Sequence, residues 1–88
     1  MISSEQLAKQ LSFTHDYNDT EDIYEKKLNY GDTVRIILNK NTFEVTKTVY
    51  AFPRIDKIDL SKEEQYMINI RIQELQTDFL QKPRGQSI

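Results

Sequence analysis

The stretch 33–52 reads TVRIILNKNTFEVTKTVYAF and decides the fold. Two runs rich in β-branched and aromatic residues flank a short joint at residues 39–42, and this pattern is typical of a β-hairpin. Because asparagine tolerates positive φ, a two-residue loop and a four-residue loop are both chemically suitable here. Either loop predicts the same cross-strand pairs: Leu38 with Phe43, Ile36 with Val45 and Arg35 with Thr46.

Side chains alternate between the two faces of a strand, so the hairpin has one apolar face and one mixed face. The apolar face is expected to point toward the core, and a slip of one residue would exchange the two faces. Lys47 is the exception on the apolar face, and we expect its long stem to reach water near the open end. The predicted core face consists of Val34, Ile36, Leu38, Phe43, Val45, Val49 and Ala51.

A long helix is predicted over residues 62–81, where it would cross the whole hairpin. Ser61 and Glu64 form an S-x-x-E capping box, in which each side chain accepts a hydrogen bond from a free backbone amide. A proline and a glycine beyond residue 81 end the helix, and residues 83–88 are expected to fray. At about 100° per residue, one apolar stripe of this helix faces the hairpin. This core stripe consists of Ile68, Ile72, Leu75 and Phe79.

A short helix is predicted at residues 3–12, near the N-terminus. Ser3 and Gln6 form a second capping box, S-x-x-Q, at its start. Leu7 and Leu11 lie four residues apart and therefore share one face. A helix of this length is not stable alone, so that face must pack against the rest of the chain.

The segment 20–30 has two interpretations. As a helix, which is the preferred prediction, it has Asp19 as its N-cap and a pair between Asp22 and Lys26. As a strand, it pairs with the first strand of the hairpin through a turn at residues 29–32. The strand interpretation produces a three-stranded meander, which is more stable than two strands alone. Residues 13–22 are interpreted as a polar connector.

The predicted fold class is therefore α+β, within a single small domain spanning residues 1–88. Its elements in chain order are a short N-terminal helix, a second helix or strand at 20–30, the β-hairpin at 33–52 and the long C-terminal helix at 62–81 packed on the hairpin.

Composition excludes several classes of protein. The chain has 88 residues, no cysteine and a formal net charge of −2, with both signs spread along it. Disulfides and thiolate metal sites are therefore excluded, and no basic surface for nucleic acid is evident. There is neither a signal-peptide pattern nor a run of about 20 apolar residues, so we expect a cytoplasmic protein without a membrane segment. Lysine outnumbers arginine eight to four, a usage frequent in AT-rich genomes, including phages and mobile elements.

The acidic stretch 16–22 begins like a calcium-binding loop, with oxygen ligands at alternate positions. A complete loop requires glycine at its sixth position and a bidentate glutamate at its twelfth. Glu21 and Lys27 occupy those positions here, so no metal and no cofactor are predicted. The stretch is interpreted as a solvated acidic loop that leads into a helix. The longer acidic stretch 16–25 is interpreted as a solvated segment, with a contact to a basic partner as the alternative.

His15 is the only histidine, and Asp16 follows it. A histidine beside a carboxylate can act as a general base. No nucleophile, glycine-rich loop or oxyanion arrangement accompanies it in the sequence. His15 is therefore predicted to be an exposed loop residue, no catalytic residue is predicted, and the chain is interpreted as non-enzymatic.

The mixed face of the hairpin is a candidate surface for single-stranded nucleic acid, because it combines a cation with aromatic rings. The alternative is that Tyr50 and Phe52 pack under the N-terminal helices. The residues of this candidate nucleic-acid face are Arg35, Thr46, Thr48, Tyr50 and Phe52.

The side of the long helix opposite its core stripe also carries apolar residues. Tyr66 and Ile70 lie there four residues apart, and Met67 and Leu80 flank them. Such a grouping is typical of a contact with another protein or with a second copy. The preferred function is therefore a protein–protein interaction or regulatory module that binds a protein partner or forms a homodimer. A small nucleic-acid-binding domain is the alternative.

Overall fold

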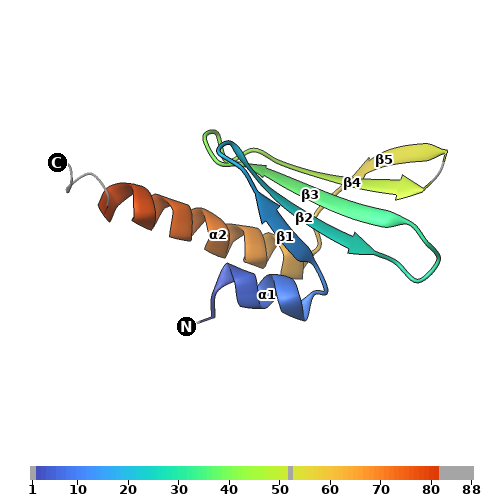
Figure 1. Ribbon diagram of the computed structural model, residues 1–88, viewed down its shortest axis with the longest axis horizontal. Coiled ribbons are helices and arrows are strands. Elements are labelled where there is room, and N and C mark those ends of the chain that lie inside the picture. The colour runs from blue at the N-terminus through green and yellow to red at the C-terminus, as the bar shows by residue number, and fades with distance from the viewer. Residues whose placement is uncertain (1, 52, 82–88) are drawn as a thin grey trace.

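The computed structural model describes residues 2–51 and 53–81, and for residues 78–81 it describes the backbone. In this part of the chain, five antiparallel strands form one sheet in the order β1-β2-β3-β4-β5, so each strand pairs with its neighbour in sequence. Both helices pack against the same face of the sheet (Figure 1). The elements are α1 (Ser4–Gln10), β1 (Thr14–Tyr17), β2 (Glu21–Lys27), β3 (Thr33–Asn39), β4 (Val45–Ala51), β5 (Arg54–Ile58) and α2 (Lys62–Gln81).

The segment 20–30 contains a strand, so the preferred helix prediction is wrong and its alternative is right. β2 pairs with β3 over its whole length, from Glu21 opposite Asn39 to Lys27 opposite Thr33. Local helix signals such as a cap or an i,i+4 pair each contribute about 1 kcal/mol or less. Pairing with β3 gives the hairpin a third strand and buries Tyr24 completely, which outweighs those local signals.

Two edge strands were not predicted. β1 lies in the segment interpreted as a polar connector, and β5 lies in the segment that follows Pro53. Both are short and mainly polar, so neither shows the apolar alternation that identifies a strand. Their conformation depends on the neighbouring strands β2 and β4, with which they pair.

The hairpin register differs from the prediction by two residues. The loop comprises residues 40–44, and within it Phe43 has a φ of 63°. The Asn39 side chain accepts hydrogen bonds from the amides of Asn41 and Thr42, at 2.8 and 3.0 Å, and so stabilises this longer loop. A shift of two residues keeps every side chain on its predicted face. The observed pairs are Leu38 with Val45, Ile36 with Lys47 and Arg35 with Thr48.

Both predicted capping boxes are present. At α1 the Ser3 hydroxyl accepts from the Gln6 amide at 3.1 Å, and the Gln6 side chain accepts from the Ser3 amide at 2.8 Å. At α2, Ser61 and Glu64 make the same reciprocal pair, at 3.1 and 2.9 Å. The predicted bounds of the long helix are confirmed, and the tail predicted to fray lies outside the described residues.

The core lies between the helices and the sheet. Ile68 of the predicted stripe is fully buried, and Ile72 and Leu75 are half-buried against the core. The side chain of Phe79 lies outside the described residues. Met67 is also fully buried, so its prediction as a flank of an exposed patch is wrong. The buried apolar residues are Ala8, Phe13, Tyr24, Val34, Ile36, Leu38, Met67 and Ile68.

The molecule is elongated, with principal extents of 50 × 25 × 18 Å. The C-terminal part of α2 extends beyond one end of the sheet, while the β2–β3 turn and β5 lie at the other end (Figure 1). Within the described residues, neither helix has the length and apolar character needed to cross a membrane.

Candidate functional site

A cluster of charged side chains joins β1 and β2 to the long helix. Asp22 of β2 is fully buried, and Arg71 of α2 donates to both of its oxygens, from Nε at 2.8 Å and from a terminal nitrogen at 3.2 Å. His15 of β1 contacts the same carboxylate through Nε2 at 2.8 Å. Asp22 is therefore not the exposed partner of Lys26 that the helix interpretation predicted.

His15 belongs to this cluster and is not an exposed loop residue. Its side chain is 7% exposed, and its ring stacks on Tyr24 with centroids 4.4 Å apart. Its second nitrogen, Nδ1, lies 2.8 Å from a carboxylate oxygen of Glu5 in α1. Both ring nitrogens thus face carboxylates of the chain itself, so neither is directed toward a substrate.

The first turn of α1 is tied to the same part of α2. The Ser4 amide and hydroxyl donate to the two carboxylate oxygens of Glu74, at 2.9 and 2.6 Å. Arg71 lies 3.5 Å from one of these oxygens. The cluster therefore fixes a short helix that could not be stable alone.

Electrostatics match this structural role. Burial raises the pKa of the Asp22 carboxyl, but hydrogen bonds from Arg71 and His15 lower it more, so the pKa is below its ordinary value. Burial and the nearby Asp22 charge raise the pKa of Tyr24 well above its ordinary value. Among the residues that the structure describes, the buried Tyr24 hydroxyl has no hydrogen-bond partner. Contacts between Asp22, Arg71 and His15, with Glu5 and Glu74 at the edges, join β1, β2, α1 and α2.

A second buried ion pair links the sheet to the start of α2. Lys47 Nζ lies 2.6 Å from Glu64 Oε1, and the two side chains are 11% and 8% exposed. The expectation that Lys47 reaches water is therefore wrong. Burial raises the pKa of Glu64, but bonds from Lys47 and Ser61 lower it below its ordinary value. A single lysine on an apolar face was the sequence signal for a buried partner, because an unpaired buried charge is costly.

The stretch that begins like a calcium loop does not gather its oxygens. Asp16 pairs with Ile23 and Asp22 with Tyr17, so the two carboxylates lie on opposite faces of the sheet. The Asn18 side chain accepts from the Thr20 amide and hydroxyl and from the Glu21 amide, at 2.8 to 3.0 Å. Among the described residues, no group of three His, Cys, Asp or Glu side chains could hold a metal ion.

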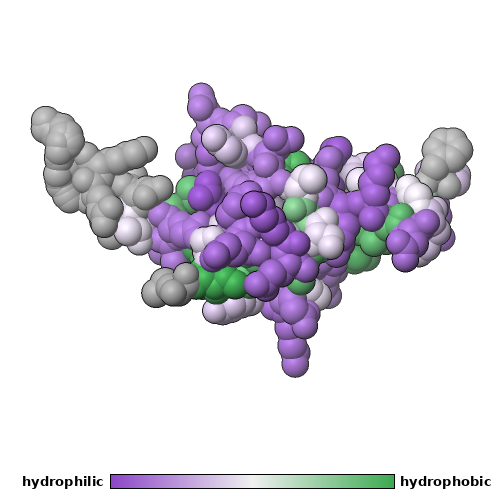
Figure 2. Space-filling model, turned by 60° about the horizontal axis from the view of Figure 1, so that its bottom comes forward, coloured by the Kyte–Doolittle hydropathy of each residue, from purple (hydrophilic) through white to green (hydrophobic). Residues whose placement is uncertain are grey.

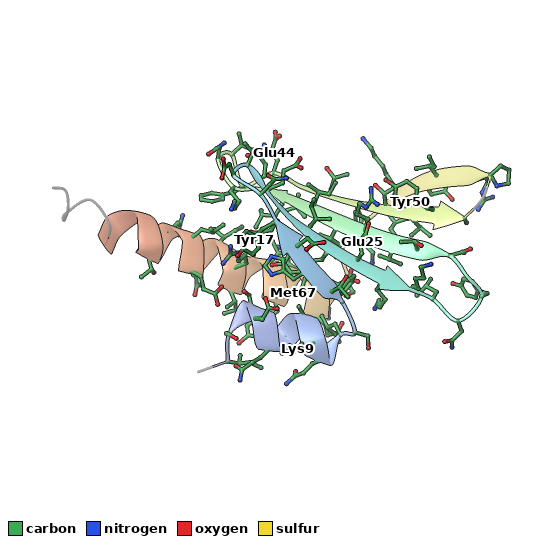
Figure 3. The ribbon with its side chains drawn as sticks, viewed as in Figure 1. Lys9, Tyr17, Glu25, Glu44, Tyr50 and Met67 are labelled. Carbon is green, nitrogen blue, oxygen red and sulfur yellow. The ribbon has the colours of Figure 1, made fainter. Side chains whose placement is uncertain are left out.

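The outer face of the sheet is the face away from α1 and α2. The register places Arg35, Thr46, Thr48 and Tyr50 together on it, while Phe52 lies outside the described residues. Tyr50 does not pack under a helix, so that alternative is wrong for this residue. Arg35 is held by an ion pair with Glu25 and lies over the Tyr50 ring, with 5.1 Å between its guanidinium carbon and the ring centroid. Glu25 and Tyr50 are labelled in Figure 3.

Beside Tyr50, the outer face also carries isoleucines that were not among the predicted site residues. Ile23 lies opposite Ile37, and Tyr50 lies opposite Ile55. Ile55 is 67% exposed, and the other three are half-buried. Only the strand interpretation of residues 20–30 places Ile23 here, which is why it was missed. We call Ile23, Ile37, Tyr50 and Ile55 the outer patch.

The outer side of α2 carries less apolar surface than predicted. Tyr66 is 52% exposed and Ile70 is half-buried, whereas Met67 is buried in the core. The side chain of Leu80 lies outside the described residues. The side of the molecule seen in Figure 2 is mainly hydrophilic, and its hydrophobic areas are small and separated. Partner binding through Tyr66 and Ile70 stays a prediction.

Comparison with protein families, curated proteins and solved structures finds no match to this chain.

Proposed function

We propose that this chain is a non-enzymatic protein–protein interaction module that binds a protein partner on the outer face of its sheet. The observation that carries this proposal is the uncovered outer patch. The helices cover the opposite face, while Ile23, Ile37, Tyr50 and Ile55 lie on the free one. A five-stranded antiparallel sheet offers a rigid platform, so little conformational entropy is lost when a partner docks.

The chemistry of the outer patch favours protein over other ligands. The Glu25–Arg35 ion pair separates the row containing Ile23 and Ile37 from the row containing Tyr50 and Ile55. Apolar side chains beside a neutralised arginine and a tyrosine are typical of protein interfaces, where aromatic residues and arginine are enriched. The buried charge cluster supports this role indirectly, because it fixes the helices on the other face.

The experiment compares partner capture by two variants that keep the fold. The wild-type chain captures its partner from the native host, mass spectrometry identifies that partner, and binding is then measured with the purified proteins. Ile37→Glu places a charge in one of the two apolar rows of the outer patch and should abolish binding while circular dichroism stays unchanged. Gln65→Glu, at an exposed position on α2, is the matched control and should bind like wild type. Equal binding by both variants would contradict the proposal.

Single-stranded nucleic acid is the second candidate for the same face. The register supports it by bringing Arg35 and Tyr50 together, with Lys57 opposite Thr48 in the next strand. Against it, the Arg35 guanidinium is already paired with Glu25. Electrophoretic shift assays distinguish the candidates, because binding through phosphates weakens steeply as salt rises. Under this alternative Glu25→Ala would strengthen binding, since it frees the guanidinium.

A further inference from the structure

β5 is an edge strand with one free side. It pairs with β4 from Ile58 opposite Lys47 to Arg54 opposite Ala51. On its other side no strand of the described chain is present (Figure 1). The outward backbone N–H and C=O groups of such an edge can pair with a strand of another chain.

The exposure of two isoleucines indicates that the free side accepts a strand. Ile55 is 67% exposed on the outer face, and Ile58 is 45% exposed on the opposite face. A partner lying on the outer face would cover Ile55 but not Ile58. A strand added beside β5 would cover part of both, because its side chains flank β5 on both faces.

The sequence of β5, RIDKI, is complementary to itself in one register. Two copies that pair edge to edge and antiparallel are related by a two-fold axis perpendicular to the sheet. The residue at this axis therefore lies opposite the same residue of the second copy. An axis at Asp56 would oppose two carboxylates, and an axis at Arg54 or Lys57 would oppose two cations, which is unfavourable. An axis at Ile58 would pair no residue of β5 other than Ile58 itself, because Lys57 would lie opposite Asp59, beyond the end of the strand. An axis at Ile55 opposes two isoleucines.

The register centred on Ile55 also pairs opposite charges. It places Arg54 of each copy opposite Asp56 of the other, on the same face of the sheet. These two side chains already attract each other within one chain, where Arg54 lies 3.2 Å from Asp56. Lys57 then has no residue of the second copy's β5 opposite it, so it faces no cation of that strand.

We propose that β5 pairs antiparallel with β5 of a second copy of this chain, centred on Ile55, and joins the two sheets into one. The charges on β5, which would repel a strand in the other registers, select this register. The proposal does not rest on the proposed function, because it uses the edge of the sheet and leaves Ile23 and Ile37 free.

Single cysteines test the register directly, because the chain has no cysteine of its own. Ile55→Cys places two thiols opposite each other at the axis and should form a covalent dimer rapidly under mild oxidation. Lys57→Cys, on the same face of the same strand, is the matched control and should cross-link at least about tenfold more slowly, since disulfide geometry requires Cα atoms within about 7 Å. Equal rates for the two variants, or faster cross-linking through Lys57→Cys, would overturn the proposal.

A charge exchange tests the same dimer without cross-linking. Sedimentation should show wild-type self-association below about 1 mM, and a monomer at all concentrations up to that value would overturn the proposal. Arg54→Asp should weaken association about tenfold, because it opposes carboxylates twice per dimer. Arg54→Asp combined with Asp56→Arg should restore association, since each copy again offers opposite charges. A double variant no stronger than the single one would also overturn the proposal.

Discussion

On each face of the sheet an arginine pairs with a carboxylate of β2, and the surroundings of these two pairs differ. On the covered face the side chains of Asp22 and Arg71 are 0% and 18% exposed. On the outer face those of Glu25 and Arg35 are each 38% exposed. The first pair has lost most of its water and is held by its neighbours, whereas water screens the second. The same chemistry therefore forms a structural joint on one face and part of an accessible surface on the other.

Neighbouring residues of β3 show the same contrast for apolar side chains. Ile36 is fully buried against the helices, and Ile37 is half-buried on the outer face. One step along the strand thus separates a residue that stabilises the fold from one that is available to a partner.

Among these changes, breaking the ion pair on each face should give the largest difference in lost stability between the two faces. Asp22→Ala removes the buried carboxylate that Arg71 contacts most closely and leaves it the more distant Glu74, so we expect a loss of about 3–5 kcal/mol in the free energy of unfolding. Glu25→Ala removes a screened pair and should cost about 1 kcal/mol or less. Urea denaturation of both variants measures the two values. Losses of similar size would show that burial does not distinguish these pairs.

Truncating neighbouring isoleucines should give the next largest difference. Ile36→Ala removes a fully buried side chain and leaves a cavity, so we expect a cost of about 2–5 kcal/mol. Ile37→Ala removes a side chain that is still partly in water and should cost about 1 kcal/mol. Thermal and urea unfolding measure the loss of stability in each of the two variants. A cost for Ile37→Ala equal to that for Ile36→Ala would indicate that another part of the protein covers the outer face.

Acid should lower the stability of the fold by protonating the carboxylates Asp22 and Glu64, which lie on the covered side of the sheet. The pKa values of Asp22 and Glu64 are lowered in the folded state. At pH values between the folded and the unfolded pKa values of these two carboxyls, the folded state therefore binds fewer protons than the unfolded state. The resulting stability is fully present above the unfolded pKa values, about 3.9 and 4.3, and is lost as pH falls through the lower folded values.

Unfolding free energies measured from about pH 6 down to about pH 3 test this expectation. Wild type should lose stability in the acidic part of this range. Asp22→Asn should be less stable near neutral pH and should show a shallower decline in acid, because one of the two groups no longer titrates. An equally steep decline in this variant would assign the acid sensitivity to other carboxyls.

Changing the outer side of α2 should have the smallest effect on stability. Tyr66→Glu combined with Ile70→Glu changes one exposed and one half-buried residue, so we expect a cost of about 1 kcal/mol. Partner capture should fall less than with Ile37→Glu. A folded double variant that loses its partner while Ile37→Glu retains it would move the interface from the sheet to α2. An unfolded double variant would show that Ile70 belongs to the core.

The sequence by itself determined those features whose causes lie within a few residues. The bounds of α2 follow from a capping box between Ser61 and Glu64 and from the breakers beyond residue 81, which act within one turn of the helix. The assignment of β3 side chains to the two faces follows from strict alternation along the strand. It stayed correct although the predicted register was wrong by two residues, because an even shift does not exchange the faces. These signals do not depend on which other element packs nearby.

Tertiary structure alone decided the features whose causes lie far away in the chain. Residues 21–27 form a strand because β3 pairs with them, although their local signals also suit a helix. Asp22 is buried because Arg71, 49 residues later, reaches it, and Lys47 is buried because Glu64, 17 residues later, accepts its charge. Burial of a charge is unfavourable until its partner is in place, so a local pattern does not identify which distant residue will be that partner. The outer patch and the free side of β5 likewise exist only after the sheet has formed and the helices have covered its other face.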